Sequence, residues 1–268
     1  MSNSATDLGH RARHSDWLDH AVRIGLVAYG VVHLMVAWLA AQLALGDRQG
    51  SASSKGALQQ LAQQPFGEVL VWLVALGMFL LVLWRVLEAA LGHREEEHRT
   101  RKRLVSALKA VLYAAIGISA LGVAMGSGGG SNGTDSTTRK LMDLPAGPWI
   151  VGAVGLAVIG YGVALCVQAW TEKFAKHLSW EGKTGDTGTA YLWFGKAGYV
   201  AKGVATAIVG GLFVYAAATH DPKKSGGLDQ ALQKVLQQPF GQVLLLVIAA
   251  GIACYGLFCF ARARHLSR

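Results

Sequence analysis

The stretch Gln-Gln-Pro-Phe-Gly at residues 63–67 returns unchanged at residues 237–241, and each copy stands just before a long apolar run. A reduced copy between them, Leu-Pro-Ala-Gly at residues 144–147, also precedes an apolar run. Self-similarity of this kind indicates that one structural unit occurs several times along a chain. The sequence therefore predicts three copies of a unit made of two hydrophobic helices and a connecting segment.

The composition places most of the chain in a membrane. Of the 268 residues, 52% are hydrophobic and 15% are charged, whereas soluble domains carry roughly 25% charged residues. The apolar residues gather in six spans of roughly 20 residues or more, enough for a helix to cross a hydrocarbon core of roughly 30 Å. Glycines within the spans would let such helices approach one another closely. The spans cover residues 24–45, 69–91, 104–126, 149–170, 195–218 and 242–261.

We therefore predict an all-α, polytopic membrane protein with six transmembrane helices. Because each unit contains two spans, successive units enter the membrane in the same direction, as parallel repeats do. The three units are then related by a pseudo-threefold axis along the membrane normal. A polar, basic tail over residues 1–19 precedes the units, which cover residues 20–91, 103–174 and 193–264.

The distribution of basic residues predicts the orientation. With the N-terminus inside, and with Lys196 at the start of the fifth span counted as inside, 15 of the 25 Lys and Arg residues lie in inside segments, 7 in outside segments and 3 within spans. An excess of basic residues marks the cytoplasmic side of a membrane protein. We expect both termini on the cytoplasmic side of the membrane. The three cysteines all fall within spans, so no disulfide framework is indicated.

The outside connections are richer in structure than simple turns. Residues 57–61 and 231–236 show apolar residues at helical spacing, which predicts short amphipathic helices along the outer surface. The connection over residues 126–138 is rich in Gly and Ser and is expected to be flexible. We expect each motif proline in the first turn of the following helix. The motif residues with a predicted structural role are Gln64, Pro65, Phe66, Gly67, Pro145, Gly147, Gln238, Pro239, Phe240 and Gly241.

The pattern of a glycine-rich first helix, a spacer, the Gln-Pro-Phe-Gly element and a second helix ending in Leu83-Trp84-Arg85 with Glu88 resembles a bacterial membrane family. That family is catalogued as domain of unknown function 1206 and is built from three two-helix units. The resemblance covers the chain beyond its N-terminal tail. It implies a fold and a location in the bacterial inner membrane, but no activity.

Ionisable residues within the spans form the candidate site, because such residues are costly in a membrane and commonly functional. Alignment of the units makes Lys109 and Lys202 equivalent, with Tyr29 at the same place in the first unit. The same alignment makes Glu88, Gln168 and Arg262 equivalent, and threefold symmetry would bring each set to a similar depth. Two interpretations stay open: structural pairing or snorkelling of the side chains, and a polar site for an ion, a lipid headgroup or a substrate. The candidate residues are Lys109, Lys202, Arg85, Glu88, Gln168 and His33.

Other chemistry finds little support in the sequence. His33 has no second ligand at metal-binding spacing, so we expect a packed or hydrogen-bonded histidine and no metal. No nucleophile–base set or carboxylate pair gathers on one side of the membrane, and no cofactor motif is present. An enzyme is therefore not predicted. The formal charge of +9 is explained by the cytoplasmic loops, and nucleic acid is not an expected partner.

The leading functional hypothesis is a structural or interaction module that associates with membrane lipids. Anionic headgroups on the cytoplasmic side are the expected lipid partners, and protein partners or a homo-oligomer remain open. The alternative is a small transporter or channel that uses an intramembrane layer of Lys and Glu, with a membrane enzyme third.

Overall fold

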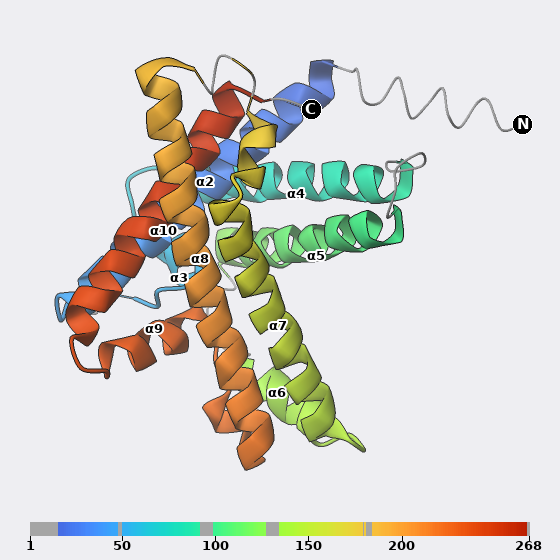
Figure 1. Cartoon of the computed structure of the whole chain (residues 1–268), viewed down its shortest axis with the longest axis vertical. Helices are drawn as coiled ribbons and strands as arrows, with labels where there is room; N and C mark the ends of the chain where they lie inside the picture. The colour runs from blue at the N-terminus through green and yellow to red at the C-terminus, as the bar shows by residue number, and fades with distance from the viewer. Residues whose placement is uncertain are drawn as a thin grey trace, which may run out of the picture.

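The structure, a computed structural model, describes residues 16–47, 50–91, 99–126, 134–178, 180 and 184–266 and is almost entirely α-helical. Six long helices carry the fold (Figure 1), and shorter helices lie in the connections. The long helices are α2 (Asp16–Ala44), α4 (Gly67–Leu91), α5 (Arg99–Ala124), α7 (Gly147–Trp170), α8 (Gly185–Thr219) and α10 (Gly241–Arg264). The short ones are α3 (Ser54–Ala62), α6 (Thr134–Met142), α9 (Leu228–Leu236) and the 3-10 turns η1 (Lys173–His177) and η3 (Pro222–Lys224).

The prediction of six membrane-spanning helices is confirmed. Within the described residues, all six long helices are long and apolar enough to cross a membrane. Large apolar side chains in the middle of the spans are exposed, for example Ile118 at 63%, Leu156 at 63% and Val247 at 63%. A soluble protein rarely exposes so much apolar surface, whereas a bilayer covers it. The first helix begins at Asp16, inside the predicted tail, and the rest of the tail lies outside the described residues.

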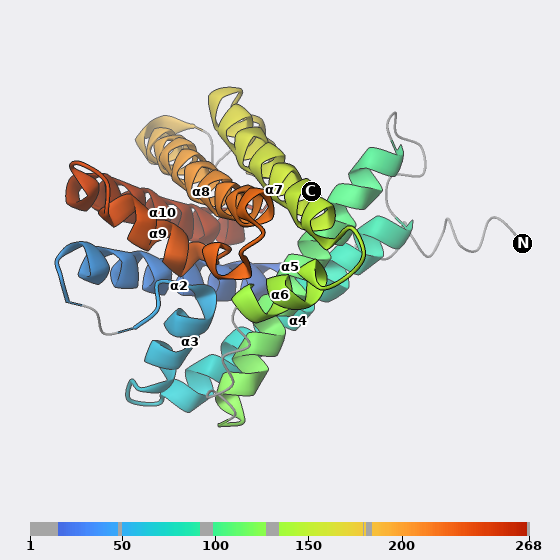
Figure 2. The same cartoon turned by 90° about the horizontal axis from the view of Figure 1, so that it is seen from below.

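The long helices pack as three pairs, and each pair joins two successive units. The second helix of each unit contacts the first helix of the next most extensively: α4 with α5, α7 with α8, and α10 with α2. Figures 1 and 2 show these three antiparallel pairs pointing in different directions. Because the third unit closes back on the first, the arrangement is cyclic, as the predicted pseudo-threefold symmetry requires.

Facing glycines set the close approach in two of these pairs. A Cβ atom on Gly162 would lie 2.6 Å from the carbonyl oxygen of Gly203, and one on Gly203 would lie 2.7 Å from that of Gly162. In the α2–α10 pair, Gly30 and Gly256 stand in the same reciprocal relation, at 2.9 and 3.0 Å. The two pairs are equivalent in the aligned units, because Gly203 matches Gly30 and Gly162 matches Gly256. Small residues permit such backbone contact in membranes, where dispersion and not water drives helix association.

The second unit departs from the symmetry. Its helices α5 and α7 do not pack along one another, although α2 packs on α4 and α8 on α10. The two packed units have glycine where their helices meet: a Cβ atom on Gly198 would lie 2.6 Å from the Cα atom of Tyr255, and Gly25 similarly faces Leu81. Val105 occupies this position in the second unit and is 42% exposed. We call the face between α5 and α7, which do not pack on one another, the open side of the second unit.

The short helices gather near the ends of the spans that the predicted orientation places outside, called the outer ends, and contact neighbouring units. Helix α3 packs against α5 of the second unit, and α9 of the third unit reaches α2 of the first. Buried Asp229 on α9 accepts a hydrogen bond from the backbone N–H of Ala52 at 2.8 Å, which joins the third unit to the first. The prediction of a flexible connection over residues 126–138 is wrong in part, because residues 134–142 form α6. Polar residues with a buried Thr138 build this helix, and apolar spacing alone missed it.

The repeated motif is a turn that reverses the chain between a short helix and a long one. In all three copies the residue before the glycine has a left-handed backbone: Phe66 has φ +60°, Ala146 +61° and Phe240 +58°. The glycine N–H donates a hydrogen bond to the carbonyl oxygen three residues earlier. Gly67 donates to Gln64 at 2.7 Å, and Gly241 donates to Gln238 at 2.8 Å. A proline at the second position and a left-handed third residue define a type II turn. The expectation for Pro65 is therefore wrong, because it lies in the turn and α4 starts at Gly67.

We expect Gly241→Ala to destabilise the protein by about 1–3 kcal/mol. A Cβ atom there would overlap the carbonyl oxygen of Leu236 and lie 2.5 Å from that of Val235, so the α9 helix would have to move. Thermal unfolding of the purified protein in detergent measures the effect. The control is Phe240→Gly, which keeps the turn and relieves its left-handed backbone, and it should unfold at the wild-type temperature or slightly above. Equal unfolding temperatures for Gly241→Ala and wild type would contradict the argument.

Candidate intramembrane polar site

Polar side chains from five of the long helices meet in the half of the bundle away from the outer ends of the spans. We define the polar cluster by its charged members and one tyrosine: Tyr29, Arg85, Glu88, Lys109, Lys202 and Arg262. Lys202 lies within electrostatic range of Lys109 and Arg262, and Lys109 lies within electrostatic range of Arg85 and Glu88. The members therefore form one group. The candidate residues that the sequence spread over three units are thus brought together, apart from Gln168, which is half-buried on α7.

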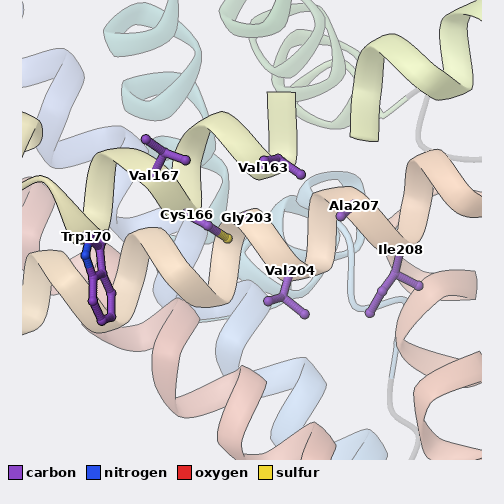
Figure 3. Close-up of a pocket in the computed structure, with 9 residues that line it drawn as sticks. Val163, Cys166, Val167, Trp170, Gly203, Val204, Ala207 and Ile208 are labelled. Carbon is purple, nitrogen blue, oxygen red and sulfur yellow. The ribbon is translucent and has the colours of Figure 1, made fainter. Parts of the chain in front are cut away.

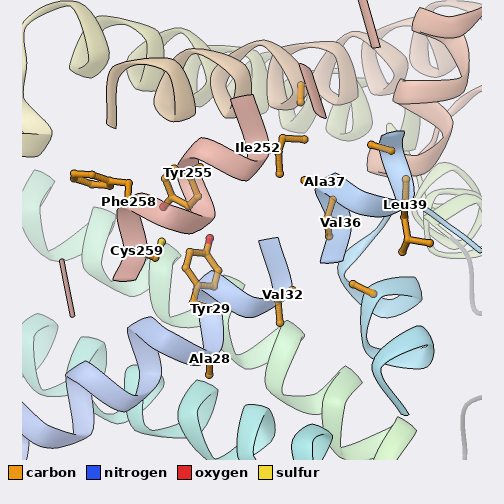
Figure 4. Packing of buried hydrophobic residues seen from close by; sticks show 14 of the residues in the cluster. Ala28, Tyr29, Val32, Val36, Ala37, Leu39, Ile252, Tyr255, Phe258 and Cys259 are labelled. Carbon is orange, nitrogen blue, oxygen red and sulfur yellow. The ribbon is translucent and has the colours of Figure 1, made fainter. Parts of the chain in front are cut away.

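Lys202 contacts two tyrosine rings, Tyr29 of α2 and Tyr255 of α10, which we call the aromatic box. Its Nζ donates a hydrogen bond to the hydroxyl of Tyr29 at 2.6 Å. The same atom lies 4.0 Å from the ring centroid of Tyr255 and 4.8 Å from that of Tyr29. Cation–π contacts of this kind are strongest where water is excluded. Figure 4 shows the Tyr29 ring of α2 pointing toward Tyr255 and Cys259 of α10.

His33 packs beside this box. Its Nδ1 donates a hydrogen bond to the backbone carbonyl of Tyr29 at 2.8 Å, and its ring lies 4.2 Å from the Tyr29 ring and 4.9 Å from the Tyr255 ring. This geometry gives His33 a place in the packing of α2 and α10. In the part of the chain that the structure describes, no group of three His, Cys, Asp or Glu residues is arranged to hold a metal ion.

Glu88 binds both its own helix and the next unit. Its carboxylate forms an ion pair with Arg85, one turn earlier on α4, and accepts a hydrogen bond from the hydroxyl of Ser106 on α5 at 2.9 Å. The Arg85 guanidinium also lies over the Trp84 ring at 4.0 Å. Arg85 is 4% exposed, so the pair is largely withdrawn from solvent. These contacts make Glu88 the carboxylate that links α4 to α5.

Arg262 is the member of the cluster with the least compensation. Arg262 is 5% exposed, and its Nε has no hydrogen-bond partner among the described residues. The Nε of Arg85 is likewise buried without a partner there. Glu88 is the only carboxylate that the described residues contribute to the cluster, against four cationic side chains. An intramembrane cation is usually paired, so the excess of positive charge is the notable property of this site.

The register along the helices separates the two equivalent sets by their distance from the outer ends of their own helices. Glu88, Gln168 and Arg262 each stand 21 residues after the first residue of α4, α7 and α10, about 31 Å along the helix axis from the outer end. Lys109 lies about 22 Å from the outer end of α5, and Lys202 about 26 Å from that of α8. The outer half of the bundle holds buried apolar residues instead, including Val36, Val74 and Leu245.

Sequence reasoning missed the tyrosines as part of the site. Tyr199 packs 5.4 Å from Tyr255, and Tyr113 lies 5.1 Å from Tyr29, centroid to centroid. Tyr161 is within electrostatic range of Tyr113 and of Arg85. The equivalence of Tyr161 and Tyr255 in the repeat was the available signal. The five phenols surround the cations with hydroxyl groups, which can both donate and accept hydrogen bonds.

An apolar groove lies apart from the cluster, between α7 and α8. It has a volume of about 610 Å³ and is lined by residues such as Cys166, Trp170 and Ile208 (Figure 3). Its lining has no charged side chain. The groove follows the glycine contact between Gly162 and Gly203 and opens onto the outer surface of the pair.

The fold and the cluster define a multi-pass membrane protein of three two-helix repeats. The chain belongs to the family described as Domain of Unknown Function (DUF1206), whose pattern matches residues 24–92, 104–172 and 197–265 and so falls on the three units. It is similar to the uncharacterized protein YxxB of Bacillus subtilis (strain 168), with 27% identity over 249 residues, covering 92% of this chain and 90% of that protein. No solved structure matches the chain.

Proposed function

We propose that the protein is a structural or interaction module of the bacterial cytoplasmic membrane that associates with anionic lipid headgroups on the cytoplasmic side. The observation that carries the proposal is the unbalanced charge of the polar cluster, with four cations and one carboxylate among the described residues. Anionic lipids concentrate in the cytoplasmic leaflet and attract basic groups near it. The cluster lies in the cytoplasmic half when both termini face the cytoplasm, which the basic residues favour.

The alternative is a small transporter or channel that uses the layer of Lys and Glu. Lys202 favours this alternative, because its ammonium group contacts Tyr29 of α2 and Tyr255 of α10 between the helices. The apolar packing of the outer half opposes it, because an ion path needs polar groups along its length. Residues near the bundle centre in that half, such as Ala40, Val71 and Ile248, are buried and apolar. The module therefore has the better support.

Two measurements on the purified full-length protein test the proposal. We expect lipids that co-purify with it to be enriched in phosphatidylglycerol relative to the membrane they came from, as measured by mass spectrometry. In proteoliposomes we expect flux of potassium and chloride at the level of protein-free vesicles, because the apolar outer half gives no route. Absence of anionic enrichment would overturn the lipid association. Flux above background that falls in Lys202→Ala would instead establish the transporter.

A further inference from the structure

We infer that the polar cluster binds one phosphate-type anionic group, held by Lys109 and Arg262 and admitted through the open side of the second unit. The inference rests on the proposed association with anionic lipids and names the site and its residues. The phosphate belongs either to a lipid headgroup or to a free anion, and the experiment below separates these sources.

The first argument is the distribution of partners within the cluster. Arg85 has Glu88 and the Trp84 ring, and Lys202 has the Tyr29 hydroxyl and two aromatic rings. Lys109 and Arg262 lie within electrostatic range of each other, and the buried Nε of Arg262 has no hydrogen-bond partner among the described residues. Two neighbouring cations repel each other in a medium of low dielectric constant. An anion between them removes the repulsion and supplies acceptors for both.

The second argument is the hydrogen-bonding character of the site. The guanidinium group of Arg262 offers donors and no acceptor, and the ammonium group of Lys109 does the same. The buried Nε atoms of Arg262 and Arg85 are both without an acceptor among the described residues. Planar guanidinium groups match the oxygens of phosphate, and charge-assisted bonds to them are the strong ones. The oxygens of a phosphate-type group would supply the acceptors that these donors need.

The third argument is access. Tyr29, the equivalent of Lys109 in the first unit, is 7% exposed, and Tyr255, the equivalent of Tyr161 in the third, is 6% exposed. Lys109 and Tyr161 in the second unit are both half-buried. Lys202, the equivalent of Lys109 in the third unit, is half-buried too, so the difference lies at Tyr161, in the unit where α5 does not pack on α7. The second unit is thus the side on which a group from the bilayer reaches the cluster.

Purified full-length protein in detergent, titrated with three probes, tests the inference by thermal unfolding. The probes are phosphatidylglycerol, phosphatidylcholine and inorganic phosphate, and the variants are Lys109→Gln and Arg262→Gln. Lys140→Gln is the matched control, because Lys140 is an exposed lysine on α6 at the outer end. We expect phosphatidylglycerol to raise the unfolding temperature more than phosphatidylcholine. Each site variant should weaken this binding roughly tenfold or more, the effect of losing one charge-assisted hydrogen bond, and Lys140→Gln should not.

The outcomes separate the possibilities. Stabilisation by phosphatidylglycerol alone assigns the anion to a lipid, whereas stabilisation by inorganic phosphate as well, with competition between the two, assigns it to a free anion. Phosphatidylglycerol binding that survives in both site variants would overturn the site but leave the proposed lipid association standing. If Arg262→Gln does not fold, native mass spectrometry of Lys109→Gln and the charge-preserving Lys109→Arg decides: the first should lose bound phosphatidylglycerol and the second should retain it.

Discussion

Replacing Gly203 with leucine is expected to destabilise the protein by about 3 kcal/mol or more, because the new side chain enters a backbone contact. The Cβ atom alone would lie 2.7 Å from the carbonyl oxygen of Gly162 and 2.6 Å from the sulfur of Cys166. The carbonyl belongs to a helix backbone that cannot turn aside, so α7 and α8 must separate. This contact joins the second unit to the third, and its loss opens the ring of units.

Gly211→Leu is the matched control for this experiment. It makes the same chemical change on the same helix, but a Cβ atom on Gly211 would have no neighbour within 4 Å. Thermal unfolding in detergent should therefore separate Gly203→Leu from Gly211→Leu, and Gly211→Leu should stay close to wild type. Similar losses in both variants would show that leucine costs stability through the helix itself and not through the contact between helices.

The repeat in the sequence predicted the helices well but not their partners. Hydrophobic runs of spanning length identify each helix, and the aligned motif identifies three units. Which helices touch depends on contacts between units, and these are set by small residues whose meaning appears only when the units are compared in space. Val105 illustrates this: its equivalents Gly25 and Gly198 each meet the second helix of their own unit, whereas Val105 does not.

The candidate site, like the fold, could be predicted from the sequence only in part. Ionisable residues in apolar spans could be found from the sequence, and so could the pairing of Arg85 with Glu88 three residues apart. The bond from Ser106 to Glu88 and the box around Lys202 could not, because they join residues of different units. Arg262 was recognised only as an equivalent of Glu88. Its burial beside the tyrosines, and so its lack of an acceptor, depends on how α10 packs against α2 and α8.

Glu88→Gln is expected to destabilise the protein by about 3 kcal/mol, the cost of breaking a buried ion pair by removing one partner. Glutamine keeps the size of the side chain and can still accept from Ser106. The loss therefore comes from the charge, which leaves Arg85 at 4% exposure with no counter-ion among the described residues and adds to the positive excess of the cluster. Thermal unfolding in detergent measures it.

The exposed pair of Glu172 and Lys196 provides the control. Its atoms lie 2.7 Å apart, but its side chains are 48% and 36% exposed, so Glu172→Gln should cost no more than about 1 kcal/mol. A second comparison isolates the pairing: the double variant Arg85→Met/Glu88→Leu removes both charges and should be less destabilised than Glu88→Gln alone. If Glu88→Gln is as mild as Glu172→Gln, burial of the Arg85–Glu88 pair does not govern its contribution to stability, and the argument is wrong.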